Sequence, residues 1–193
     1  MLSLPLLIGN LGQNTFGLWT LVSAIIGVAM LAEAGLSTSM TYFSARSIAA
    51  NDSTALGQNL TATLSAVTAL AVLAASLLFA GSDWLVSFFD KLDAAQRVAA
   101  STALRIGAFA VVALLFQHIM IGLIRGFQRF DLSNLLSTLQ VAANIGGYIY
   151  VSAHGGGIVA MMYWHLVVSV VGLAAYVLVA GYLLRGRAVR PSW

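Results

Sequence analysis

The sequence predicts an all-α, polytopic transmembrane helix bundle of about six spans, the first of them truncated, and two observations support this fold class. Apolar residues make up 60% of the 193 residues, charged residues only 8%, and the mean hydropathy is +0.93. Soluble domains have about a quarter of their residues charged. In addition, apolar segments of spanning length follow one another with short connections. We therefore expect one transmembrane domain over residues 1–193.

The first element is a short apolar stretch at residues 2–8, which we interpret as the end of a truncated span. It has neither the basic leader nor the small-residue cleavage site of a signal peptide. A turn at residues 9–16 is expected to lead into the second span, at residues 17–43. Since a hydrocarbon core about 30 Å thick needs roughly 20 helical residues, this window is long enough to cross unaided.

The third, fourth and sixth spans are expected at residues 60–80, 103–124 and 156–184. Each is long and apolar enough to cross the bilayer. The fifth span, at residues 134–153, is long enough but is interrupted by polar residues and a glycine pair. We therefore place it among other helices rather than against lipid.

The longest connection lies between the third and fourth spans, at residues 82–100. It contains the helix-forming run DKLDAAQRVAA, preceded by Trp84, Phe88 and Phe89. Tryptophan and other aromatic side chains are common at membrane interfaces. The connection therefore predicts an amphipathic helix that lies on the outer surface of the membrane.

Basic residues are distributed unequally between the two sides of the predicted bundle. One side carries Arg46, Arg125, Arg129, Arg185, Arg187 and Arg190, and the other carries Lys91, Arg97 and Arg105. The positive-inside rule places the six-arginine side in the cytoplasm. An even number of spans then puts both termini in the cytoplasm, which requires residues 2–8 to be a real span.

Several classes of function are disfavoured by what the sequence lacks. It shows no paired carboxylates, serine with a base, or phosphate-binding loop, and His118, His154 and His165 lack metal-ligand spacing. The net charge of +3 is carried by connections, without a basic cluster interleaved with aromatic residues. We therefore expect no enzymatic activity, no metal or cofactor, and no nucleic-acid partner.

Polar side chains recur inside the predicted spans. On the second span, one helix face carries Glu33, Ser37, Thr41 and Ser44. A carboxylate at mid-membrane costs about 3 kcal/mol on insertion scales, so Glu33 needs a partner or a wet cavity. Two interpretations are open. Glu33 lines a cavity and couples an ion, or it lies near enough to the cytoplasmic end to reach water or cap a helix.

The fourth span carries His118 and Arg125 on one face, and Arg105 near its outer end on another. An inward-facing cationic stripe would suit an anionic substrate such as a diphosphate, because a guanidinium group offers paired donors to phosphate oxygens. Alternatively, Arg105 and Arg125 lie at the two interfaces and extend toward the lipid headgroups.

Two further spans have polar faces, with Ser137, Gln140 and Asn144 on the fifth span and His165, Ser169, Gly172 and Tyr176 on the sixth. Such residues commonly form interhelical hydrogen bonds worth about 1 kcal/mol each. Polar residues on so many spans predict a polar interior, either a cavity or a seam between helices. The candidate cavity or substrate residues are Glu33, His118, Arg125, Gln140, Asn144 and His165.

Three stretches, taken in order, resemble the polysaccharide flippases for O-antigen and exopolysaccharide within the multidrug/oligosaccharidyl-lipid/polysaccharide exporter superfamily. The first is LGQNTFGLW at residues 11–19, similar to the family's turn between its first two spans. The second is LAEAGLSTSMTYFSA at residues 31–45, similar to its acid followed by Gly-Leu, and the third is IRGFQRFDLSN at residues 124–134, similar to its basic connection between spans four and five. The resemblance places Glu33 on the family's acidic position and Arg125 and Arg129 on its basic loop.

The resemblance implies one lobe of a protein with roughly twelve to fourteen helices in two six-helix lobes. Such a protein moves a lipid-diphosphate-linked oligosaccharide across the bacterial inner membrane for polysaccharide and lipopolysaccharide biosynthesis. The likeness covers nearly the whole chain but only the amino-terminal lobe, and alternating access needs two. We expect truncation, because residue 1 falls where a helix should already be under way. Alternatively, the second lobe is a separate chain, or two copies of this chain pair.

The partners expected for such a chain are the lipid-linked oligosaccharide, membrane lipids, and a second lobe or second copy. Two other functions are compatible with the sequence. A drug or small-cation exporter of the same superfamily would have a cavity rich in acids, so inward-facing Arg105 and Arg125 would disfavour it. A non-transporting membrane subunit would use the same polar faces only to join helices.

Overall fold

The structure is a computed structural model that describes residues 3–31, 35–90 and 92–185. All regular structure in these ranges is helical, which confirms the predicted all-α bundle. The helices are α1 (Ser3–Met30), α2 (Leu36–Ala49), α3 (Ser53–Ala80), α4 (Ser82–Ser87), α5 (Ala94–Gly126), α6 (Phe130–Ala153) and α7 (Ile158–Leu184).

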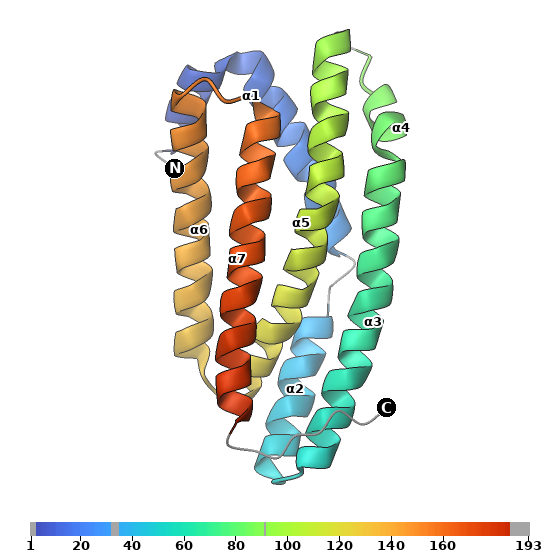
Figure 1. Ribbon diagram of the computed structural model, residues 1–193, viewed down its shortest axis with the longest axis vertical. Coiled ribbons are helices and arrows are strands. Elements are labelled where there is room, and N and C mark those ends of the chain that lie inside the picture. The colour runs from blue at the N-terminus through green and yellow to red at the C-terminus, as the bar shows by residue number, and fades with distance from the viewer. Residues whose placement is uncertain (1–2, 32–34, 91, 186–193) are drawn as a thin grey trace.

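The long helices lie side by side along the long axis of the molecule, with α6 and α7 on one side of α5 and α3 on the other (Figure 1). Helix α5 contacts each of the other six helices described here. The most apolar part of α5 is 67% buried, against 22% for the corresponding parts of α3 and α7. Helix α5 is therefore the centre of the bundle.

Three of the described helices, α3, α5 and α7, are long and apolar enough to cross a membrane. The outer faces of α3 and α7 expose large apolar side chains, among them Leu77 at 63% and Leu178 at 74%. In water, such continuous apolar surface would favour association with another surface. A lipid environment accommodates it, and the chain is a membrane protein.

The predicted span at residues 17–43 is not one helix. Helix α1 ends at Met30 and α2 begins at Leu36, after Gly35, whose φ of 100° lies in the left-handed region. Glycine adopts this conformation without a Cβ penalty, so it can interrupt an otherwise apolar helix. Glu33 falls between these two helices in the sequence and lies outside the described residues.

The predicted turn at residues 9–16 is also wrong, because these residues are helical within α1. Figure 1 shows the change of direction as a bend of α1 near the upper end of the molecule. Residues 3–8 are therefore not a separate span. The start of α1 and the end of α7 lie at opposite ends of the bundle (Figure 1). The sequence, in contrast, predicts both termini on the same side.

The predicted interfacial helix within residues 82–100 is wrong in its extent. Only Ser82–Ser87 form a short helix, α4, whereas residues 94–100 are the first turns of α5. The reason is a capping box. The backbone N–H of Gln96 donates to the Asp93 carboxylate at 2.7 Å, and the backbone N–H of Asp93 donates to Gln96 Oε1 at 3.2 Å. A capping box begins a helix by satisfying two free N–H groups.

The short helix α2 approaches α5 closely at two glycines. A Cβ on Gly122 would lie 2.5 Å from the Ser37 carbonyl oxygen and 3.0 Å from Met40 Cβ, and one on Gly126 would overlap the Ser44 side chain. Small residues four apart allow membrane helices to pack in this way. The part of α2 from Ser37 to Ser44 is therefore in direct contact with α5.

Replacing Gly122 with valine should lower the stability of the protein, because the added atoms have no space between α2 and α5. Overpacked interiors lose about 1 to 3 kcal/mol. Thermal unfolding in detergent, followed by circular dichroism, should show a lower midpoint for Gly122→Val. The control is Gly146→Val on α6, where a Cβ meets no heavy atom within 4 Å. Equal midpoints for the two variants would contradict the proposed close packing.

Candidate functional site

Polar side chains follow one face of α6 from its lower to its upper end. They are Ser133, Ser137, Gln140, Asn144 and Tyr148, at intervals of three and four residues. Residues at these intervals share one face of a helix. This face meets α7 along its length and α5 at the lower end, and we call the resulting line of polar contacts the α6 seam.

The lower part of the α6 seam holds a cation. Arg125, at the end of α5, donates from Nε to the Ser133 hydroxyl at 3.3 Å. The Ser137 hydroxyl donates to the Ser133 carbonyl at 2.9 Å and lies 2.8 Å from the Tyr176 hydroxyl of α7. Ser133 and Tyr176 are buried. Three helices are thus joined around a guanidinium group that is partly exposed.

In the middle part of the α6 seam, two side-chain amides lie beside one glycine. A Cβ on Gly172 of α7 would lie 2.9 Å from Gln140 Oε1 and 3.0 Å from Gln117 Nε2. The buried Gln117 amide of α5 also donates to the Ser169 carbonyl. Gln140, Gly172 and Tyr176 border a largely apolar groove of about 370 Å³ between α6 and α7. Glycine at position 172 therefore leaves the space that the two amides occupy.

The upper part is an aromatic and polar cluster. His165 Nδ1 lies 2.7 Å from the Tyr148 hydroxyl and 3.3 Å from Asn144 Oδ1. The Trp19 ring of α1 meets Tyr148 edge to face, with the ring centroids 4.9 Å apart. Trp19, Tyr148 and His165 line a cavity of about 340 Å³. Four helices contribute to this cavity, since Leu114 of α5 also lines it.

The structure brings four of the six candidate residues into one seam: Arg125, Gln140, Asn144 and His165. His118 lies on α5 one turn before Gly122 and takes no part in the contacts given above. Glu33 lies outside the described residues, so its place relative to the seam stays a prediction.

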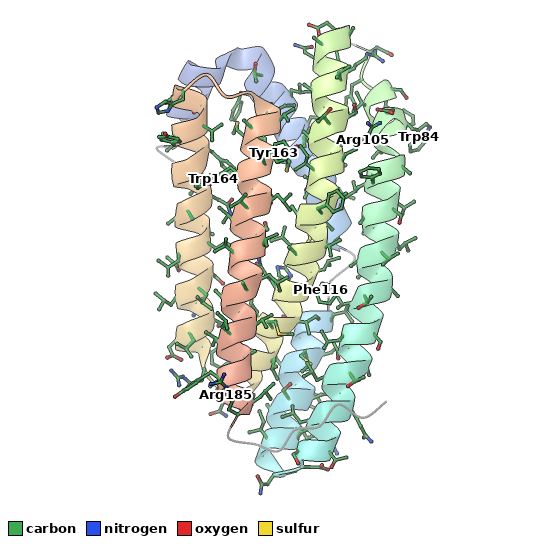
Figure 2. The ribbon with its side chains drawn as sticks, in the orientation of Figure 1. Trp84, Arg105, Phe116, Tyr163, Trp164 and Arg185 are labelled. Atoms are coloured by element: carbon green, nitrogen blue, oxygen red, sulfur yellow. The ribbon has the colours of Figure 1, made fainter. Side chains whose placement is uncertain are left out.

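Arg105 does not belong to a cationic stripe. Its guanidinium group donates to Asp83 at 2.7 Å and to the Ser82 hydroxyl at 3.0 Å, and both side chains of the ion pair are well exposed. Figure 2 shows Arg105 beside Trp84 near the upper end of the bundle, far from Arg185 at the lower end. This exposed ion pair favours the interpretation of Arg105 as an interface residue, which stays a prediction.

Acidic side chains lie at helix ends and connections wherever the structure describes them. Asp52 and Asp93 cap α3 and α5, Asp83 lies in α4, and Asp131 pairs with Arg129 at the start of α6. Across the described ranges, no group of three or more histidine and acidic side chains could hold a metal ion. The described part of the seam thus contains no carboxylate to balance Arg125.

Sequence reasoning missed Trp19, Ser133 and Tyr148 as seam residues. Ser133 and Tyr148 could have been found by extending the predicted polar face of the fifth span by one turn at each end, since Ser137 and Asn144 were already on it. Trp19 carries no such signal. Its contact with Tyr148 joins the first and sixth helices of the chain, and only the tertiary structure shows it.

The described geometry is a membrane-embedded bundle with a polar seam that carries one half-buried cation and no described acid. A comparison with known families agrees with that arrangement. The model of the family described as MatE matches residues 2–149, from the beginning of α1 into the last turns of α6. No curated protein and no solved structure matches the chain. Because the family model covers well over half of the sequence, the chain belongs to the MatE family, whose members are transporters of the multidrug/oligosaccharidyl-lipid/polysaccharide exporter superfamily.

Proposed function

We propose that this chain is the amino-terminal lobe of a flippase that moves a lipid-diphosphate-linked oligosaccharide across the bacterial inner membrane, for polysaccharide biosynthesis. One observation carries the proposal: Arg125 is bound into the α6 seam, and the described residues of that seam include no carboxylate. A polar path with a net positive charge favours an anionic substrate.

The chemistry at Arg125 suits a diphosphate. The bond to Ser133 uses Nε and orients the plane of the guanidinium group. A guanidinium group has five N–H donors in a fixed fork, and its terminal nitrogens match two oxygens of one phosphate. Ser133 holds the group at the end of α5, and Tyr176 of α7 in turn bonds to Ser137 beside Ser133, so a headgroup that enters the bundle here would meet the guanidinium group between α5, α6 and α7.

A drug or small-cation exporter is the rival within the same superfamily. Cationic substrates favour acidic side chains in the cavity, because opposite charges attract most strongly where water is excluded. The described acids instead cap helices or lie near helix ends. Arg105 no longer counts against this rival, since Asp83 neutralises it at the outer end. The preference for a flippase over a drug exporter therefore rests on Arg125 alone.

The proposal includes a second lobe. Alternating access requires two units that move against each other around a shared site. The described helices form one bundle around α5, and they supply one such unit. We propose that the second unit is another lobe, on the same chain, on a separate chain or in a second copy, and that the arginine-rich end faces the cytoplasm.

Replacing Arg125 with alanine should lower transport of a lipid-diphosphate-linked oligosaccharide by about tenfold or more, because a hydrogen bond to a charged group contributes about 1.5 to 3 kcal/mol. The assay uses vesicles that contain the full transporter and a fluorescent label on the glycan, quenched by an impermeant reagent. Arg46→Ala is the matched control, an exposed arginine on α2 at the same end of the bundle.

Wild-type rates in Arg125→Ala, or equal losses in Arg125→Ala and Arg46→Ala, would contradict the role of Arg125. Movement of a cationic dye but not of the lipid, in the same vesicles, would identify a drug exporter.

Introduced cysteines should separate a transport path from a structural seam, since the chain has no cysteine of its own. His165→Cys borders the 340 Å³ cavity, whereas Ser169→Cys, one turn further on α7, is fully buried. A water-soluble thiol reagent should label the first variant and not the second. Protection of both cysteines would favour a subunit whose polar residues only join helices.

A further inference from the structure

The cavity at the upper end of the α6 seam has the size of a binding site for a small ligand. Its volume is about 340 Å³, and it lies between α1, α5, α6 and α7. Ligand pockets have volumes of roughly 300 to 1,000 Å³ and combine apolar walls with a few oriented polar groups. Trp19 and Tyr148 supply aromatic walls, and His165 and Ser23 supply polar atoms.

The hydrogen bonds around His165 orient its imidazole ring. The Tyr148 hydroxyl and Asn144 Oδ1 both approach Nδ1, at 2.7 Å and 3.3 Å. The other ring nitrogen, Nε2, is therefore the one left for a ligand. Asn144 does not line the cavity, and it acts as a positioning residue behind His165. The edge-to-face contact with Trp19 fixes the Tyr148 ring in the same way.

The residues that line the cavity include no aspartate, glutamate, lysine or arginine, so the cavity suits a neutral ligand. The ligand needs an apolar face for the aromatic rings and hydroxyl groups for His165 and Ser23. A sugar ring in the pyranose form has both, because its axial C–H bonds form apolar patches and its hydroxyl groups lie around the edge. The face of an aromatic ring is electron-rich and buries apolar surface, so such C–H patches can pack against it.

The position of the cavity relative to Arg125 agrees with this chemistry. Ser133, which holds Arg125, and Tyr148 are 15 residues apart on α6, or about 22 Å at 1.5 Å per residue. Polar side chains of the α6 seam connect the two positions. A diphosphate at Arg125 would therefore direct an attached oligosaccharide of several sugars along the seam toward the cavity.

We propose that the cavity at Trp19, Tyr148 and His165 is a subsite for one pyranose ring of the transported glycan. The subsite rests on the proposed function, since it assigns the glycan part of the same substrate. It gives the seam two recognition points, with Arg125 for the diphosphate and the cavity for a sugar.

Glycine at position 27 allows a test that leaves the aromatic and polar side chains of the cavity unchanged. Gly27 lines the cavity on α1, and a Cβ there meets no heavy atom within 4 Å. Gly27→Leu should fill the space without a clash. Gly17→Leu is the matched control, on the same helix and away from the cavity, where a Cβ also has open space. Trp19→Ala removes the aromatic wall, and Trp84→Ala on α4 is its control.

The experiment measures binding of two probes to the full transporter in lipid nanodiscs. One probe is a polyprenyl diphosphate that carries a disaccharide, and the other is the same lipid diphosphate without sugar. Gly27→Leu and Trp19→Ala should raise the Kd of the disaccharide probe at least fivefold and leave the Kd of the sugar-free probe unchanged. Arg125→Ala should raise both values. Gly17→Leu and Trp84→Ala should change neither.

Equal effects of Gly27→Leu on both probes, or no effect on either, would overturn the subsite while leaving the flippase proposal intact. Should the wild type bind neither probe, the flippase proposal fails, and methyl glucopyranoside then tests the cavity alone by ligand-observed NMR. Saturation transfer to this sugar from the wild type and Gly17→Leu, but not from Gly27→Leu, would support the subsite. Absence of transfer from the wild type would overturn it.

Discussion

A bilayer offers no hydrogen-bond partners in its hydrocarbon core, and this constraint shapes the bundle. Every polar group inside must find a partner in the protein or in enclosed water. The α6 seam meets the requirement in a chain of contacts from Arg125 and Ser133 at one end to Tyr148 and His165 at the other. Polar residues recur along one face of α6, and several of their side chains contact α5 and α7. The prediction that this span lies among other helices rather than against lipid is therefore wrong: α6 turns its polar face to α5 and α7, while its other face exposes large apolar side chains such as Leu135 and Leu139.

Close packing makes the seam possible, because hydrogen bonds between helices need backbones that approach each other. Glycine supplies the space at several points. Gly172 leaves room for the two amides, and Gly147 accepts the indole ring of Trp164, which donates to the Ala143 carbonyl at 3.0 Å. Figure 2 shows Trp164 on α7 near the upper end of the bundle, opposite α6. On the other side of α5, Gly122 and Gly126 bring α2 into contact. The central position of α5 follows from these contacts on opposite faces.

Much of this arrangement could be predicted from the sequence, since apolar windows and helical spacing are local properties. Helices α3, α5, α6 and α7 lie where the apolar windows predict them, and Arg125, Gln140, Asn144 and His165 share one seam. The break before Gly35 and the early start of α5 at Asp93 depend on single residues, which hydropathy averages over a window cannot detect. Which helix a polar face meets is a tertiary property. Arg125, for example, directly precedes Gly126, which packs against α2, yet its side chain binds Ser133 of α6.

Structural and transport roles of the seam are compatible. Each interhelical hydrogen bond in a membrane protein contributes only about 1 kcal/mol, so a substrate hydroxyl or phosphate oxygen can replace one at small cost. The lower end differs, because Arg125 carries a full charge and the described seam residues around it carry none of opposite sign. A charge in such a position is retained where it has a partner, and an anionic headgroup would supply one that the described protein does not. The seam therefore holds the helices together, and the proposed anionic substrate depends on the charge of Arg125.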